Sequence, residues 1–131
     1  VIIGDKCVLG HTSEIKSSVM LGESKAGHFA YIGDSILGKV NLGAGTKLAN
    51  LKIVKSPIII TAMGQRHDTG LRKFGAIIGD GVETGCNSVT APGSIISKNS
   101  QIYSNVAFRG FCPADSIIKL KQNQEIIKKR S

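Results

Sequence analysis

The sequence is poor in aromatic residues and in long hydrophobic runs: among 131 residues it has no tryptophan, four phenylalanines and two tyrosines. No apolar segment approaches the roughly 20 residues that span a bilayer, and the first residues lack the basic, apolar and small-residue order of a signal peptide. The scattered aromatics form no platform beside basic residues, as nucleic-acid binding would require. We therefore expect neither a membrane nor a nucleic acid as partner.

Cysteine is also scarce. Cys7, Cys86 and Cys112 are odd in number and far apart, with no C-x-x-C pair, so neither a disulfide framework nor a cysteine zinc site is expected. The three histidines form no H-x-H or H-x-x-x-H pair, so no metal site is predicted. This cysteine usage favours a reducing cytoplasm.

Length and charge narrow the choices further. A chain of 131 residues suits one domain plus a tail, and its first residue, Val1, leads us to expect a segment of a longer protein. The formal net charge of +8 favours an anionic partner such as a nucleotide or a sugar phosphate. Much of that charge lies in the C-terminal tail, where the cations are Lys119, Lys121, Lys128, Lys129 and Arg130.

A six-residue repeat runs through most of the chain. It begins at Ile3 with IGDKCV, LGHTSE, IKSSVM and LGESKA, resumes at Ile32, and returns in a second block from Ile78. Helices favour apolar spacings of three and four and ordinary strands favour alternation, and a period of six fits neither. It fits a chain that turns a corner every six residues, so that three faces close a coil of roughly 18 residues. The sequence therefore predicts an all-β fold, a parallel β-helix of triangular cross-section with about five or six coils.

Two stretches break this repeat. Residues 52–74 lose the pattern, and we interpret them as an excursion from one coil corner, of the kind that forms lids or subunit contacts. After Pro113, Ile117, Leu120 and either Ile126 or Ile127 lie near helical spacing with Asp115 as an N-cap. We expect a β-helix domain over residues 1–113 and a C-terminal helical cap over residues 114–131.

One segment carries residues that the repeat itself does not require. The run Ser24-Lys-Ala-Gly-His28-Phe-Ala-Tyr31-Ile-Gly-Asp34, followed by Asn41-Leu-Gly-Ala44-Gly-Thr46 and Asn50, resembles the acetyltransferase domain of bifunctional GlmU-type enzymes. The excursion and the stretch TGLRKFGAIIGDG look more like the archaeal sugar-1-phosphate nucleotidyltransferase/acetyltransferase form. This resemblance implies a left-handed β-helix, a homotrimer, and a place in UDP-N-acetylglucosamine biosynthesis.

The resemblance also implies roles for individual residues. In that family the histidine corresponding to His28 takes a proton from the amine of glucosamine-1-phosphate as the amine attacks acetyl-CoA, work suited to an imidazole that titrates near physiological pH. Backbone N–H groups of the small Ala44-Gly45 turn could stabilise the thioester oxygen. The implied sugar-phosphate contacts are Glu14, Lys16, Tyr31, Asn41 and Lys73, the last from an adjoining subunit. The implied acetyl-CoA contacts are Ala44, Asn50 and Cys86.

Two positions differ from the bacterial form: Leu51 stands where tyrosine is usual, and Cys86 where serine is usual. They keep open a second hypothesis, a non-catalytic oligomerisation or regulatory β-helix attached to a sugar-1-phosphate nucleotidyltransferase. A third hypothesis keeps the mechanism but changes the amino sugar, for example to galactosamine-1-phosphate.

Overall fold

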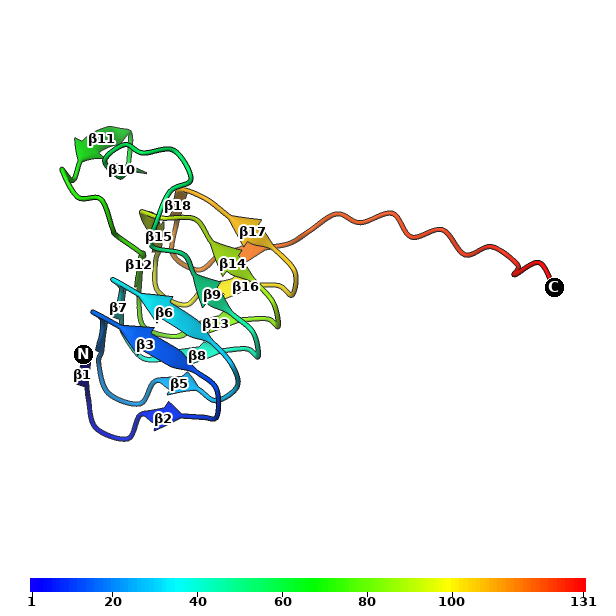
Figure 1. Cartoon of the computed structure of the whole chain (residues 1–131), viewed down its shortest axis with the longest axis horizontal. Helices are drawn as coiled ribbons and strands as arrows, with labels where there is room; N and C mark the ends of the chain where they lie inside the picture. Colours follow the sequence, from blue (N-terminus) through cyan, green and yellow to red (C-terminus); the bar gives the residue numbers. More distant parts are fainter.

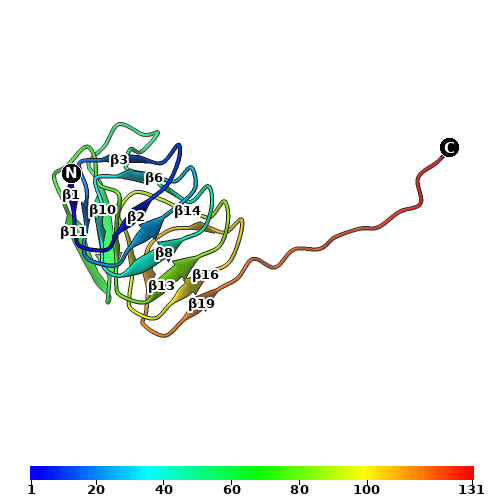
Figure 2. The ribbon, with the colours of Figure 1, turned by 90° about the horizontal axis from the view of Figure 1, so that it is seen from below.

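The chain folds as a prism built from three parallel sheets. A computed structural model describes all 131 residues and contains 19 short strands and no helix. We name the sheets A, B and C, in the order in which the chain visits them; they form the three sides of the prism when it is seen from below (Figure 2).

Each sheet takes one strand from each coil. Sheet A contains β1 (Ile2–Ile3), β4 (Val19–Met20), β7 (Ile36–Leu37), β12 (Ala76–Ile78), β15 (Ser94–Ile96) and β18 (Phe111–Cys112). Sheet B contains β2 (Val8–Leu9), β5 (Lys25–Ala26), β8 (Val40–Leu42), β13 (Val82–Thr84), β16 (Gln101–Ile102) and β19 (Ile117–Ile118). Sheet C contains β3 (Glu14–Lys16), β6 (Tyr31–Gly33), β9 (Lys47–Leu48), β14 (Val89–Thr90) and β17 (Ala107–Phe108).

The chain makes five complete coils and two sides of a sixth (Figure 1). Every pairing within the three sheets is parallel, as Ile15 beside Ile32 and Ile77 beside Ile95 illustrate. The predicted all-β, parallel β-helix of triangular cross-section is therefore confirmed.

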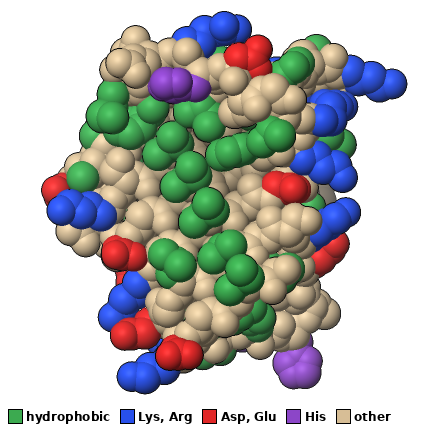
Figure 3. All heavy atoms as spheres, turned by 90° about the vertical axis from the view of Figure 1, so that its left-hand side faces the viewer, with side chains coloured by type: hydrophobic (Ala, Val, Ile, Leu, Met, Phe, Trp, Pro, Cys, Tyr) green, Lys and Arg blue, Asp and Glu red, His purple; other side chains and the backbone are tan.

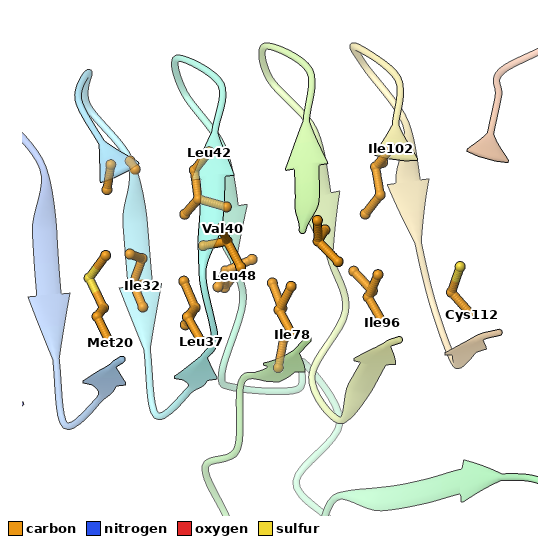
Figure 4. Close-up of a cluster of buried hydrophobic side chains, with 14 of the residues drawn as sticks. Met20, Ile32, Leu37, Val40, Leu42, Leu48, Ile78, Ile96, Ile102 and Cys112 are labelled. Atoms are coloured by element: carbon orange, nitrogen blue, oxygen red, sulfur yellow. The ribbon is translucent and has the colours of Figure 1, made fainter. Parts of the chain in front are cut away.

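The core is a column of aliphatic side chains along the prism axis (Figure 4). Most coils send one such residue inward from each face, among them Ile32, Leu37, Leu42 and Leu48. Fully burying one of these side chains stabilises the fold by about 1.5–3 kcal/mol. Because each is covered by the coils above and below it, stability is a sum over neighbouring coils.

The corners impose their own requirement on the sequence. At nearly every corner one residue has a positive φ, a conformation that L-residues other than glycine, asparagine and aspartate adopt at a cost. At the corner between sheets B and C these residues are Thr12, Phe29, Gly45, Asn87 and Asn105. At the corner between sheets C and A they are Ser17, Asp34, Gly93 and Gly110.

The expected excursion leaves the corner between sheets C and A and returns to it. Its base is closed by a bridge between Leu51 and Lys73 and by the Phe74 N–H, which donates to the Asn50 carbonyl at 2.9 Å. Within it, β10 (Ile59–Ala62) and β11 (Gln65–Asp68) form an antiparallel hairpin that projects beside the coils (Figure 1).

The expected C-terminal helix is wrong. β19 pairs with β16 and continues sheet B, so the β-helix extends past Pro113 to Ile118. Asp115 has a φ of 57° and forms a coil corner instead of a helix N-cap. Residues 119–131 form neither helix nor strand and run away from the prism (Figures 1 and 2). So short and so basic a segment has too little packing to offset the cost of nucleating a helix.

The outer faces of the three sheets differ in polarity. On sheet A one ladder of outward residues is wholly apolar, and Figure 3 shows hydrophobic side chains in a column across this side of the molecule. This apolar ladder is Ile2, Val19, Ile36, Ile77, Ile95 and Phe111. The matching ladder of sheet B is polar at its centre, with Lys25, Asn41, Glu83 and Gln101. No helix is present that could cross a membrane.

Candidate functional site

The residues between sheets B and C stack into a column at one corner of the prism. Backbone hydrogen bonds join each coil to the next: Phe29 N–H donates to His11, Gly45 N–H to His28 and Asn87 N–H to Ala44. Asn105 N–H then donates to the Cys86 carbonyl at 3.0 Å. We call this set the corner column; it comprises His11, His28, Ala44, Cys86 and Ser104. Three of the predicted site residues, His28, Ala44 and Cys86, therefore lie at successive steps of about 4.8 Å.

The side chain of His28 does not contribute a hydrogen bond or ion pair to the fold. Its side chain is exposed and makes no hydrogen bond or ion pair with any other residue. The neighbouring Phe29 has a φ of 32° and is 55% exposed, an unfavourable combination for a large aromatic residue. An unpartnered imidazole beside a strained corner is free to meet a ligand.

The turn above His28 offers a backbone donor. Gly43 N–H donates to Thr84 and Gly45 N–H donates to His28, but Ala44 N–H has no acceptor in the chain. Gly45 must be glycine, because its φ is +74° and a Cβ there would lie 2.3 Å from Asn87 Oδ1. The turn therefore presents one free N–H directly above the histidine, on a backbone that its neighbours hold in place.

The outer face of sheet C gathers a second group of predicted residues. Glu14 lies beside Tyr31 in the ladder, and Lys16 lies beside Gly33. Lys47 continues the ladder after Tyr31, and its ammonium donates to the Gly45 carbonyl at 2.7 Å, toward the corner column. This face thus carries two cations, a carboxylate and a phenol, a set that suits a phosphorylated sugar.

Asn50 connects this face to the corner between sheets C and A. Tyr31 Oη donates to Asn50 Oδ1 at 3.2 Å, and Asn50 Nδ2 donates to Asp34 Oδ2 at 2.5 Å. Asn50 is only 8% exposed. The structure therefore places it with the sugar-side residues and away from Ala44 and Cys86, and its assignment as an acetyl-CoA contact stays a prediction.

Asn41 lies on a different face. It is exposed on β8 of sheet B, between Lys25 and Glu83. It also lines a groove of about 550 Å³ that follows sheet B toward the later coils and the first tail residues. Other residues of this groove are Glu83, Gln101, Tyr103, Ser104, Asn105, Leu120 and Gln122.

Lys73 lies far from the corner column within one chain. It is exposed at the base of the excursion, on the other edge of sheet C from His28, and it borders a hollow that Asp34 and Phe74 also line. One chain thus brings together Glu14, Lys16, Tyr31 and Asn50 on sheet C, and separately His28, Ala44 and Cys86 at the corner. It leaves Asn41 on sheet B and places Lys73 next to the Asn50 end of the sheet C group, away from the corner column.

Sequence reasoning missed two residues of this region. Asp34 belongs to an ordinary Ile-Gly-Asp corner tripeptide that recurs at Asp5 and Asp80, so nothing in the sequence marks it. Lys47 follows the Gly-Ala-Gly-Thr turn, where a lysine looks like any solvated strand residue. For Lys47 the available signal was its register, one coil from Tyr31.

Comparison with known proteins gives the chain clear relatives. It is 38% identical to the bifunctional protein GlmU of Methanococcus aeolicus over 123 residues, which is 93% of this chain. It is 40% identical over 103 residues to the bifunctional sugar-1-phosphate nucleotidylyltransferase/acetyltransferase of Sulfurisphaera tokodaii, covering 78% of this chain. The chain spans 30% and 26% of the lengths of these two relatives. No protein-family model matches it.

Solved structures agree on the fold. The acetyltransferase domain of PglB from Neisseria gonorrhoeae superposes with a TM-score of 0.61 at 10% identity, covering 88% of this chain and 49% of that one. A serine acetyltransferase from Entamoeba histolytica superposes with a TM-score of 0.54 at 15% identity, over 98% of this chain and 36% of the other. The resemblance to GlmU-type and archaeal bifunctional proteins, and the left-handed β-helix, are confirmed.

Proposed function

From the similarity of nearly the whole chain to GlmU-type bifunctional proteins, we propose that it is an N-acetyltransferase domain that moves acetyl from acetyl-CoA to a hexosamine-1-phosphate. Glucosamine-1-phosphate is the proposed acceptor, and the product serves UDP-N-acetylglucosamine synthesis. One observation carries the proposal: an unpartnered His28 occupies the step of the corner column next to Ala44, whose N–H has no acceptor in the chain. Acyl transfer needs those two groups together, a base and an oxyanion donor.

The reaction assigns each group a step. The amine nitrogen attacks the thioester carbon, so that a C–N bond forms while negative charge develops on the carbonyl oxygen. Ala44 N–H donates to that oxygen, and His28 removes a proton from the attacking nitrogen as that nitrogen becomes positively charged. The C–S bond then breaks, and the departing thiolate of coenzyme A takes that proton from His28.

The sugar side of the site is proposed on the outer face of sheet C. Lys16 attracts the phosphate, Tyr31 contacts the sugar ring, and Glu14 approaches the amine. The pairing of β3 with β6, which places these three residues on one face, supports these roles. Asn41 is proposed as a further sugar contact, reached from the sheet B side of the corner. On the acetyl-CoA side, Ala44 and Cys86 are proposed contacts on the corner column.

We also propose a homotrimer. The apolar ladder of sheet A includes Ile36, which is 49% exposed in the single chain, and burial of that ladder against other copies would remove it from water. Lys73 and His28 lie on opposite edges of sheet C, and in the proposed trimer Lys73 reaches the substrate of an adjoining copy. Light scattering tests the assembly: the native chain should be trimeric, and Ile36→Glu should dissociate it.

The cytoplasm is the proposed compartment. All three cysteines are free thiols, and Cys86 is exposed, which suits a reducing environment.

The first experiment measures thiol release from acetyl-CoA by the purified chain, with glucosamine-1-phosphate and with galactosamine-1-phosphate. His28→Ala should lower turnover by roughly 10²-fold or more, the usual contribution of a general base. His11→Ala is the matched control, because His11 follows a glycine at the same position of the corner column one coil below. Its turnover should equal that of the native chain.

Equal losses in both variants, or full activity of His28→Ala, would contradict the mechanism. A native trimer with no turnover would instead favour the alternative, a non-catalytic β-helix that assembles a nucleotidyltransferase.

A further inference from the structure

Tyr31 is held by a short chain of hydrogen bonds that no step of the proposed reaction uses. Asp34 accepts from Asn50 Nδ2 at 2.5 Å, and Asn50 Oδ1 accepts from the Tyr31 hydroxyl at 3.2 Å. Asp34 lies at the corner between sheets C and A with a φ of 45°, and its own backbone bonds Lys16 and Gly75. The carboxylate is thus fixed at one end, and the phenol at the other.

The direction of these hydrogen bonds follows from chemistry. An ionised carboxylate can only accept, so the Asn50 amide must turn its nitrogen toward Asp34. Its carbonyl oxygen then faces Tyr31, and an oxygen that only accepts requires the phenol to donate. Asp34 therefore sets the polarity of the Tyr31 hydroxyl through Asn50, although the two residues do not touch through their side chains.

Gly33 provides the space in which Tyr31 and Asn50 meet. Tyr31 and Asn50 reach across Gly33, where a Cβ would lie 2.6 Å from Asn50 Nδ2 and 2.7 Å from Tyr31 Oη. Asn50 is nearly buried, so its amide exchanges little with water. The absence of a side chain at Gly33 is what lets the phenol and the amide meet.

We infer that Asp34 is a positioning residue which, through Asn50, turns the lone pairs of the Tyr31 hydroxyl toward the substrate. This inference rests on the proposed function and deepens it. With its hydrogen committed to Asn50, Tyr31 accepts a hydrogen bond from a hydroxyl or ammonium of the amino sugar. A phosphate oxygen offers no hydrogen to such a lone pair, so the phosphate is left to cations such as Lys16.

Asp34→Asn tests this polarity, because asparagine tolerates a positive φ as well as aspartate does. The new amide can donate to Asn50, which lets the Asn50 amide turn over and donate to Tyr31. The phenol hydrogen then points toward the sugar, and the acceptor is lost. Loss of one hydrogen bond of about average strength weakens binding by roughly 10-fold.

The experiment measures the dissociation constant of glucosamine-1-phosphate by calorimetry, together with kcat and both KM values. Asp34→Asn and Tyr31→Phe should each weaken sugar binding roughly 10-fold, raise the KM for the sugar phosphate alike, and leave kcat and the KM for acetyl-CoA nearly unchanged. Because both changes remove the same contact, the double variant should bind no more weakly than Tyr31→Phe.

Asp80→Asn is the matched control. Asp80 ends the same Ile-Gly-Asp tripeptide at the corner between sheets A and B, where its carboxylate accepts from Lys39 N–H at 2.8 Å. The Asp80→Asn substitution removes a comparable corner carboxylate far from Tyr31, so sugar binding should not change.

Three outcomes overturn the inference: native affinity in Asp34→Asn, additive losses in the double variant, or an equal loss in Asp80→Asn. The binding assay also separates this inference from the proposed reaction. A native chain that binds the sugar phosphate without turnover refutes the reaction, and the same comparison of dissociation constants still decides the role of Asp34. A native chain that does not bind the sugar phosphate refutes both.

Discussion

Thr90 is a buried polar residue whose replacement by valine should stabilise the protein. It is 1% exposed on β14, points into the core between Leu48 and Phe108 of the neighbouring coils, and its Oγ1 has no hydrogen-bond partner. A buried hydroxyl without a partner costs about 1–3 kcal/mol. Valine has nearly the same shape and no polar atom, so Thr90→Val should raise stability by about 1–2 kcal/mol.

Thr84→Val provides the matched control, because it makes the same change at a satisfied site. Thr84 Oγ1 lies 2.7 Å from Thr46 Oγ1 and accepts from Gly43 N–H at 3.2 Å. Removing it leaves those groups with fewer partners, so this variant should lose about 1 kcal/mol or more. One substitution therefore should have opposite effects at two inward-facing threonines.

Thermal unfolding followed by circular dichroism measures both changes, at one protein concentration because assembly also affects Tm. For a chain of this size 1 kcal/mol shifts Tm by about 3–5 °C. Thr90→Val should melt several degrees above the native chain and Thr84→Val below it. A Thr90→Val variant that melts at or below the native temperature would show that the hydroxyl is satisfied, and the reasoning from its isolation would fail.

Two further predictions concern coil contacts. Gly10→Ala should destabilise the fold by more than about 3 kcal/mol, because a Cβ there would lie 1.5 Å from the Gly27 carbonyl oxygen. A Cβ at Gly27 would have no atom within 4 Å, so Gly27→Ala should melt near the native temperature. Equal melting temperatures of the two variants would contradict the packing argument. Glu23→Gln should lower Tm slightly at neutral pH, since the hydrogen bond and then the charge of Glu23 raise the pKa of the exposed Lys39 above 10.5. A raised pKa means that the pair stabilises the folded chain at neutral pH and ceases to do so as pH rises through that pKa, so melts at rising pH should converge, and a widening gap would refute the assignment.

The β-helix could be predicted because its repeat is visible within short segments of about six residues. Most coils place an inward aliphatic residue on each face, so Ile32, Leu37, Leu42 and Leu48 recur at intervals of five or six residues. The fold makes the same local demand in every coil, and a pattern repeated so many times survives individual exceptions. The excursion could be located for the same reason, as the one place where that demand lapses.

The C-terminal helix was wrong because two patterns competed over the same residues. Helical spacing among Ile117, Leu120 and Ile126 was real, but Cys112 and Ile118 are also six residues apart and continue the coil. Pairing with β16 gives Ile117 and Ile118 backbone partners, and Ile118 packs against the core, contacts that an isolated helix of this length lacks. The repeat, already established over five coils, was the stronger signal.

The site could be predicted only in part, because some of its residues belong to one local sequence motif and others meet only through contacts between coils. His28 and Ala44 are carried by a local motif, and their stacking in the corner column follows from the coil period. The Asp34–Asn50 contact instead depends on an exact register between coils at the point where the excursion begins, and on the empty space above Gly33. Neither condition has a marker in a single sequence.

The corner between sheets B and C shows why this fold can host chemistry without loss of stability. Its positive-φ position is constrained in every coil, and the hydrogen bonds that join successive steps of the corner column run from backbone N–H to backbone carbonyl. The position just before it is free, and five coils fill it with four different residue types: His11, His28, Ala44, Cys86 and Ser104. A base, a small residue beside an unpaired N–H and a thiol can therefore occupy neighbouring steps of the column, because no coil needs any particular side chain there.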